Sequence, residues 1–233
     1  MRRTLSLLLI SLFFAGGAIK PLDTAIAQSR TQTLDDLMPQ SSQPTLSKRD
    51  ITGRVTIFDS VLVHPMPDWL PKEIQANPIR STKINRSRDE RSLLLEMIPR
   101  EETFEDWRNL YTIIGFRDYP GDNASHARAI MRQFRDNCSP SNLMIGPLQG
   151  NPRLAMLVTA CGSFARQRDM GEVAAFVLLQ NGKTVARLAR EWRGPAFRSE
   201  DPNQWPVSRA SIQRIIQTMT RASLTTSPLT GDQ

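Results

Sequence analysis

Hydrophobic residues in segment 51–224 alternate with polar ones in most stretches and recur at helical spacing in two others. The alternation in residues 51–63 predicts one strand, and the apolar runs 92–99, 111–116 and 154–161 predict three more. The alternating apolar positions of the first strand are Val55, Ile57, Val61 and Val63. This part of the chain is therefore expected to form a sheet.

The dipeptide Asn181-Gly182 lies between two further strand-like runs. Asn-Gly suits the two positive φ angles of a type I′ turn, which joins the strands of a tight β-hairpin. Pairing across this turn would place Leu178 opposite Val185.

Two amphipathic helices are predicted. Residues 123–137 carry apolar side chains at positions i, i+3, i+4 and i+7, which form a single stripe, and the segment after Ser208 repeats this spacing. Asn123 or Ser125 is expected to cap the first helix, and Ser208 the second. A third, short helix is expected after Thr103, whose hydroxyl can cap it.

The order of these elements predicts an α+β fold with a mostly antiparallel sheet covered by helices. Residues 51–224 are long enough for one core and are expected to form a single domain. Residues 28–50 are polar and punctuated by prolines, which predicts a disordered linker, and residues 225–233 are expected to be a flexible tail.

Residues 1–27 have the pattern of a secretory signal peptide. Arg2 and Arg3 precede an apolar run, and Ala25-Ile26-Ala27 matches the small-x-small pattern before a cleavage site. We therefore expect export to the periplasm or beyond in a Gram-negative bacterium, cleavage after Ala27, and no transmembrane segment afterwards. The alternative is an uncleaved anchor, although the run is short of the roughly 20 residues that a membrane span needs.

The sequence contains two cysteines, Cys138 and Cys161. An oxidising compartment would let them pair, and a disulfide closing this loop could contribute roughly 3 kcal/mol to stability. Two free buried thiols are the alternative. Their spacing matches no metal-binding or redox motif.

The formal net charge is +7, and most of the basic residues are arginine. Guanidinium groups recognise phosphates, carboxylates and acidic glycans, but an arginine-rich composition can also reflect a GC-rich genome. Charges of both signs are interspersed, so we expect no nucleic-acid partner.

The segment EMIPREETFEDW, residues 96–107, is the densest acidic cluster. Its carboxylates are Glu96, Glu101, Glu102, Glu105 and Asp106. Paired carboxylates can hydrolyse glycosides, and a small hydrolase would need Glu101 or Glu105 beside a second, distant acid. Helix capping and the helix dipole explain the same residues without catalysis, and we prefer that interpretation.

The remaining chemistry-bearing residues form no recognisable site. His64 and His126 lie apart from any metal-binding pattern, and Ser163 lacks the surroundings of a nucleophile elbow. We therefore predict no catalytic residues, no metal and no cofactor.

Arginine and tryptophan gather in the segment WRGPAFRSEDPNQW and just before it. The candidate partner-binding residues are Arg190, Trp192, Arg193, Arg198 and Trp205. These two residue types are enriched where interfaces concentrate their binding energy. The alternative is that the tryptophans close the edge of the domain.

A short motif within the acidic cluster resembles a pattern in uncharacterised exported proteins of Gram-negative bacteria. The matching residues are Pro99, Arg100, Glu102, Thr103 and Trp107. The order of elements also looks like the PsbP-like α/β/α sandwich, whose members are commonly extrinsic subunits or accessory factors of envelope and thylakoid complexes. The resemblance implies a non-catalytic partner role and transfers no catalytic residue.

The function expected from the sequence is that of an exported accessory or binding protein. It would be a non-catalytic subunit or assembly factor of an envelope complex, such as a periplasmic dehydrogenase or secretion machinery. The alternatives are a small hydrolase acting on envelope material and a binder of an anionic small molecule that uses Arg190 and Arg193.

Overall fold

The computed structural model describes residues 52–70 and 81–226, which form two antiparallel sheets and two α-helices. The expected leader, the 28–50 linker and residues 227–233 lie outside the described residues. The smaller sheet has the strand order β1 (Thr52–Ile57), β2 (Ser60–Pro65) and β11 (Ser223–Thr226). The fold is α+β, as predicted, with every strand pair antiparallel.

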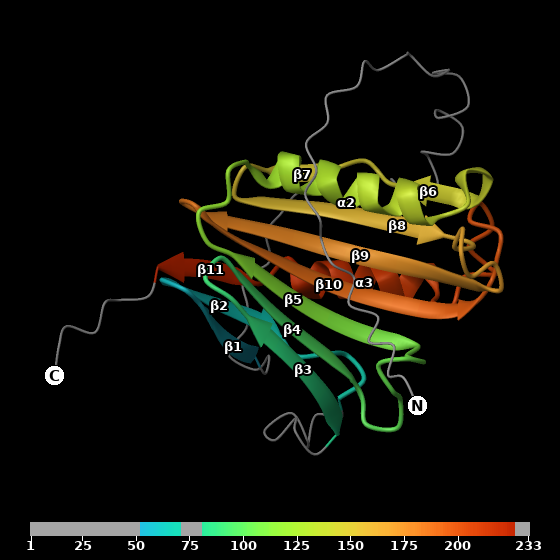
Figure 1. The fold of residues 1–233 in the computed structure, drawn as a ribbon, viewed down its shortest axis with the longest axis horizontal. Helices are drawn as coiled ribbons and strands as arrows, with labels where there is room; N and C mark the ends of the chain where they lie inside the picture. Colours follow the sequence, from blue (N-terminus) through green and yellow to red (C-terminus); the bar gives the residue numbers. More distant parts are fainter. Residues whose placement is uncertain (1–51, 71–80, 227–233) are drawn as a thin grey trace, which may run out of the picture.

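The larger sheet has eight strands, and its long central strands are β9 and β10 (Figure 1). In spatial order its strands are β3 (Thr82–Arg88), β4 (Ser92–Pro99), β5 (Asn109–Phe116), β10 (Thr184–Pro195), β9 (Met170–Asn181), β8 (Leu154–Cys161) and β6 (Leu143–Ile145), with β7 (Gln149–Asn151) also paired to β8. A 3-10 turn, Pro140–Asn142, precedes β6.

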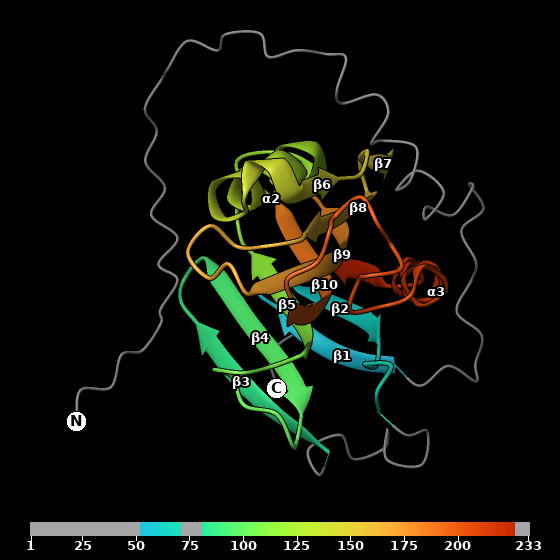
Figure 2. The same cartoon turned by 90° about the vertical axis from the view of Figure 1, so that its right-hand side faces the viewer.

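The two faces of the larger sheet pack against different partners. Helix α2 (Asn123–Asn137) covers β8 and β9 on one face, and helix α3 (Arg209–Met219) lies with the smaller sheet on the other (Figure 2). Alternate residues of β9 divide between these cores: Val173 and Val177 face α3, whereas Ala174 and Leu178 face α2. Because both faces are buried, β9 has a continuous apolar run instead of polar alternation.

The smaller sheet packs closely against the larger one at Gly115. A Cβ atom at this position would lie only 2.3 Å from Ile57 Cγ2. Glycine is therefore required here so that the β1–β2 hairpin can pack on β5.

The structure corrects several expected elements. The predicted single strand over 51–63 is two strands, because the chain reverses at Phe58 and Asp59, with φ of +55° at Phe58. Strand β3 was missed because six of its seven residues are exposed and it lacks apolar alternation. Strands β6, β7 and β11 were also missed, and Thr225 and Thr226 of the expected tail belong to β11.

The expected helix after Thr103 is absent, since residues 100–108 contain only turns and bends. Thr103 Oγ1 accepts a hydrogen bond from the Asp106 backbone N–H at 3.1 Å, so it closes a turn without starting a helix. Helix α2 spans the predicted residues, but its cap is Asp122, which accepts from the Ser125 N–H. Ser208 caps α3 as predicted.

The β9–β10 hairpin is present, but its register differs from the prediction. Asn181 pairs with Thr184 and Leu178 with Arg187, so the turn residues are Gly182 and Lys183. Gly182 alone takes a positive φ, +59°, which fits a turn with glycine at its first central position. The partner of Leu178 is thus two residues further along β10 than predicted, and a shift of two residues leaves each side chain on the same face of the sheet.

The disulfide between Cys138 and Cys161 is present, with Cα atoms 5.7 Å apart. It joins the residue that ends α2 to the last residue of β8. Both cysteines are buried in the core beneath α2, and the bond therefore fixes this helix to the sheet.

Replacing both cysteines with alanine is expected to lower the free energy of unfolding by about 3 kcal/mol, because the loop between them is no longer closed in the unfolded chain. Urea unfolding of the oxidised protein, followed by circular dichroism, measures this difference. Ser139→Ala, beside the disulfide, is the control and should change stability by less than about 0.5 kcal/mol. A double variant as stable as the wild type would contradict the assigned role.

Candidate functional site

Strand β10 carries most of the charged residues that the sequence associates with binding, and its successive side chains face opposite sides of the sheet. Arg190 and Trp192 face the α3 side. Arg187, Glu191 and Arg193 face the α2 side. The strand therefore presents two separate polar clusters.

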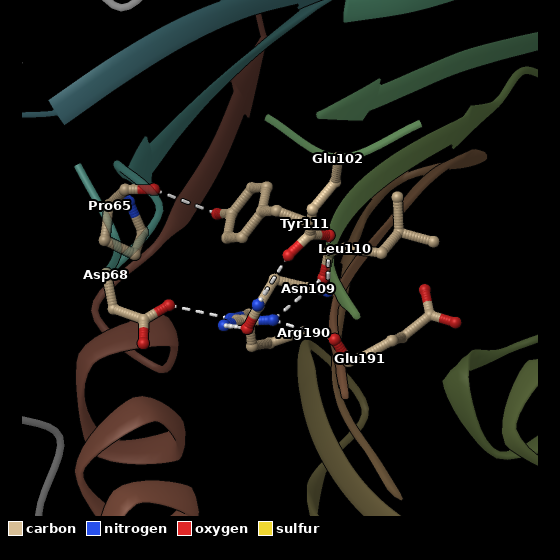
Figure 3. Close-up of polar contacts among 8 residues, drawn as sticks. All are labelled: Pro65, Asp68, Glu102, Asn109, Leu110, Tyr111, Arg190 and Glu191. Carbon is tan, nitrogen blue, oxygen red and sulfur yellow. Dashed lines mark hydrogen bonds and ion pairs between the residues drawn. The ribbon is translucent and has the colours of Figure 1, made fainter. Parts of the chain in front are cut away.

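Arg190 is at the centre of the first cluster and is 2% exposed. Its Nε donates to Asp68 Oδ1 at 2.7 Å, and its Nη2 donates to Asn109 Oδ1 at 2.9 Å (Figure 3). Nη1 donates to the backbone carbonyls of Glu191 at 2.7 Å and Leu110 at 3.4 Å. Burial lowers the pKa of the guanidinium and Asp68 opposes this effect, so the cation is held by a nearly complete set of acceptors.

Two tryptophan rings also contact the Arg190 guanidinium. Its Cζ lies 4.5 Å from the ring centroid of Trp69 and 4.5 Å from that of Trp192. A guanidinium on aromatic faces gains cation–π attraction, which increases when water is excluded. The packing of Arg190 therefore joins β10 to the loop that follows β2.

Glu102, from the acidic segment, supports this cluster. Its carboxylate accepts the backbone N–H groups of Arg108 and Asn109 at 2.8 and 2.9 Å, and the Asn109 side-chain amide at 2.9 Å. Glu102 thereby orients the Asn109 oxygen toward Arg190 (Figure 3). This acid has a structural role.

The other acids of the segment are dispersed. Glu101, Glu105 and Asp106 are exposed, and Glu96 accepts a hydrogen bond from Asn85 at 2.8 Å. The hydrolase alternative required Glu101 or Glu105 beside a second acid, and both instead point to the protein surface.

Tyr111, opposite Arg190 on β5, holds the end of β2. Its hydroxyl donates to the Pro65 carbonyl at 2.9 Å (Figure 3). The same hydroxyl lies 3.2 Å from His64 Nδ1. Burial raises the pKa of Tyr111 and lowers that of His64, so both side chains are neutral near pH 7. His64 is thus part of the core.

The predicted partner-binding residues are mostly internal. Arg190, Trp192 and Trp205 are at most 7% exposed in the isolated chain, so none of the three projects from the surface as an exposed binding residue would. The alternative interpretation, tryptophans that close the domain, describes them correctly. Arg193 has a side chain 22% exposed, and Arg198 one 68% exposed. Arg198 is therefore the clearest surface residue of the five.

The second cluster, on the α2 side, brings together two acids that the sequence did not identify. Glu172 is 5% exposed and shares a side-chain hydrogen bond with Glu191 from the neighbouring strand. Burial, followed by the charge of Glu191, raises the pKa of Glu172 to about 8, although Arg193 Nη2 donates to it at 3.1 Å. Burial likewise raises the pKa of Glu191, which accepts from Thr112 Oγ1 at 2.9 Å.

This pair can hold a proton near neutral pH, because two adjacent buried carboxylates cannot both ionise cheaply. Arg193 stays beside it, with its Cζ 3.8 Å from the Trp107 ring centroid and 5.5 Å from that of Phe164. A usable signal was present in the sequence. The charged residues Arg187, Glu191 and Arg193 are separated by even numbers, which places them on one face of a strand.

Within residues 52–70 and 81–226, no helix has the length and apolar character needed to cross a membrane. The same part of the chain contains no group of three or more metal-ligating side chains.

No protein-family model matches the chain, and no curated protein matches it in sequence. Among solved structures, the fold is similar to that of the Ran-binding protein Mog1p of Saccharomyces cerevisiae, determined at 1.9 Å resolution. The TM-score is 0.44 and the sequence identity 10%, over 74% of this chain and 94% of Mog1p. A likeness of this extent leaves the function to be argued from the residues themselves.

Replacing Arg190 with alanine is expected to lower the free energy of unfolding by about 3–5 kcal/mol. The change leaves Asp68 without its cation and removes the contacts with both tryptophans. Urea unfolding at pH 7 measures the loss. Arg198→Ala, an exposed arginine of the same region, should cost less than about 0.5 kcal/mol, and equal losses in the two variants would contradict the central role of Arg190.

The contribution of Glu172 to stability, measured as the difference between the wild type and Glu172→Gln, is expected to fall as pH rises from the ordinary pKa of a glutamate toward 8, because folded Glu172 keeps a proton that the unfolded chain releases. The contribution of one such group is at most about 1.4 kcal/mol per pH unit. Glu172→Gln keeps a neutral hydrogen-bonding side chain and should remove this slope. Unfolding free energies measured between pH 5 and pH 9 test the prediction, with the exposed Glu105→Gln as control; an unchanged slope in Glu172→Gln would contradict it.

Proposed function

We propose that this protein is an exported accessory protein, a non-catalytic subunit or assembly factor of an envelope complex, which contacts its partner through residues 195–210. The observation that carries the proposal is a surface hollow in this segment, with a volume of about 450 Å³. Its lining includes Pro202, Asn203, Trp205 and Val207.

The hollow is suited to receive a side chain of a partner protein. One wall is Trp205, whose Nε1 donates to the Ser199 carbonyl at 3.0 Å and whose ring is thereby held in place. Interfaces concentrate binding energy where a side chain fills a preformed, largely apolar site surrounded by a polar rim. Arg198, ion-paired with Glu200 at 3.0 Å, supplies exposed charge in the same segment.

Two features support a location outside the cytoplasm. Residues 1–27 have the pattern of a signal peptide. The disulfide between Cys138 and Cys161 is of the kind that persists in oxidising compartments such as the periplasm. Together they favour a partner in the envelope, such as a periplasmic dehydrogenase or secretion machinery.

The finer fold that we propose is a variant of the PsbP-like α/β/α sandwich. Its support is the placement of α2 and α3 on opposite faces of the larger sheet (Figure 2). The smaller sheet beside α3 is an addition to that layered arrangement.

Affinity purification after chemical crosslinking in the native host tests the proposed surface. The wild-type protein should recover a defined set of envelope proteins. Arg198→Glu combined with Asn203→Trp, which reverses the charge and fills the hollow, should reduce that recovery by about tenfold, because a blocked central contact costs at least 1.4 kcal/mol.

Lys183→Glu is the matched control, since it changes an exposed charge at the hairpin turn, at the opposite end of β10. It should leave recovery unchanged, and all variants should unfold at the same temperature. Recovery of the wild type as a lone monomer, or equal recovery by the double variant, would contradict the proposal.

A further inference from the structure

Arg187 differs from the other arginines of β10 because it forms no close ion pair with an acid among the described residues. Arg190 and Arg193 are both ion-paired, whereas Arg187 forms none of the ion pairs found among the described residues. Its Nε is buried and has no hydrogen-bond partner in that part of the chain. Residue Arg187 as a whole is partly exposed.

His126 of α2 is the second basic side chain at this position. It is 4% exposed, and neither ring nitrogen has a hydrogen-bond partner among the described residues. Burial, and then the charge of Arg187, lower the pKa of His126 to about 3. Two orphaned buried nitrogens are costly, and a bound group that accepts or donates a hydrogen bond would remove that cost.

The surroundings combine aromatic rings with positive charge. The His126 ring centroid lies 5.2 Å from that of Phe116 and 5.1 Å from that of Tyr119. Burial raises the pKa of Tyr119, and the charges of Arg132, Arg128 and Arg187 oppose this effect more than that of Asp122 adds to it, so positive charge predominates near this hydroxyl. The Arg187 guanidinium also lies 5.9 Å from the centroid of the Phe176 ring.

The acids in this region make their hydrogen bonds with residues other than Arg187. Glu191 and Glu96 nevertheless act electrostatically on Arg187. Glu96 accepts from Asn85, Glu191 accepts from Thr112, and Asp122 caps α2 through Ser125. Glu96 and Glu191 would repel a doubly charged anion more strongly than a singly charged one. The environment of Arg187 therefore favours a ligand with a single negative charge.

We propose that Arg187 and His126 form a binding site for the carboxylate of a small aromatic organic acid. The planar guanidinium can bind both carboxylate oxygens, and the imidazole can donate one further hydrogen bond. The rings of Phe116 and Tyr119 provide the apolar contacts for the body of the ligand. This site lies on the α2 side of the sheet and does not depend on the partner surface at residues 195–210.

The test uses benzoate as the probe and the two histidines of the chain as reporters. Titration of the full, oxidised protein with benzoate, followed by NMR of the histidine ring protons, should shift the His126 signals saturably. The bound carboxylate should raise the pKa of His126 by about one unit or more. His64, buried at the end of β2 and apart from this site, should not change.

Arg187→Met keeps the length of the side chain without its charge and should weaken benzoate binding by about tenfold or more. Arg166→Met, at an exposed arginine, is the matched control and should bind as the wild type does. His126→Phe, which preserves the aromatic packing, provides a second variant if Arg187→Met is unstable, with binding then measured by calorimetry. It should also weaken binding.

Several results would overturn the proposal. One is the absence of any saturable shift of His126 in the wild type, which would mean that water alone satisfies the orphaned nitrogens. A second is equal binding by the wild type and Arg187→Met. A third is a response to sulfate but not to benzoate, which would exclude a carboxylate as the ligand. None of these outcomes bears on recovery of the envelope partner, so the two proposals fail independently.

Discussion

Arg190 is the residue on which the arrangement of the two sheets depends. A buried guanidinium is tolerated only where its donors are satisfied, and here the acceptors come from the loop after β2, from β5 and from β10 itself. Asp68 is 122 residues away from Arg190 in sequence. Any shift in the register of β10, or in the position of the loop after β2, would leave this cation without a partner. The same requirement explains why Asn109 is held by Glu102 and why Trp69 and Trp192 lie against the guanidinium.

The two faces of β10 have different consequences for function. On the α3 side, charge is neutralised within the protein and serves cohesion. On the α2 side, burial raises the pKa values of Glu172 and Glu191, and the Arg193 guanidinium lies over the Trp107 ring. Among the described residues, the buried Nε of Arg187 has no hydrogen-bond partner. Residues that stabilise the fold and residues free to bind are therefore neighbours in sequence and are separated only by the direction of their side chains. The partner surface proposed at residues 195–210 lies just beyond the same strand, where the chain leaves the sheet.

Local patterns in the sequence predicted the elements with strong periodicity. The stripe of residues 123–137 predicted α2, and Ser208 marked the start of α3, because helical spacing and capping depend on residues close in sequence. Strand β3 was not predictable in this way, since Lys83, Arg86 and Arg88 give it no apolar face. It forms because β4 offers it a pairing edge. The hairpin was recognised from Asn181-Gly182, but its register was not, because this dipeptide marks a turn without fixing which two residues occupy its central positions.

The sequence by itself determined the fold class, the two helices, the hairpin and the pairing of Cys138 with Cys161, since these depend on periodicity, turn chemistry and the small number of cysteines. The tertiary structure decided the environment of each charged side chain. It buried Arg190 and Trp205, which looked like surface residues, brought Glu172 beside Glu191, and left Arg187 and His126 with unused hydrogen-bonding groups. The physical reason is that the free-energy cost of burying a charge depends on partners that only the fold brings together. No local pattern in the sequence shows which distant residues become those partners.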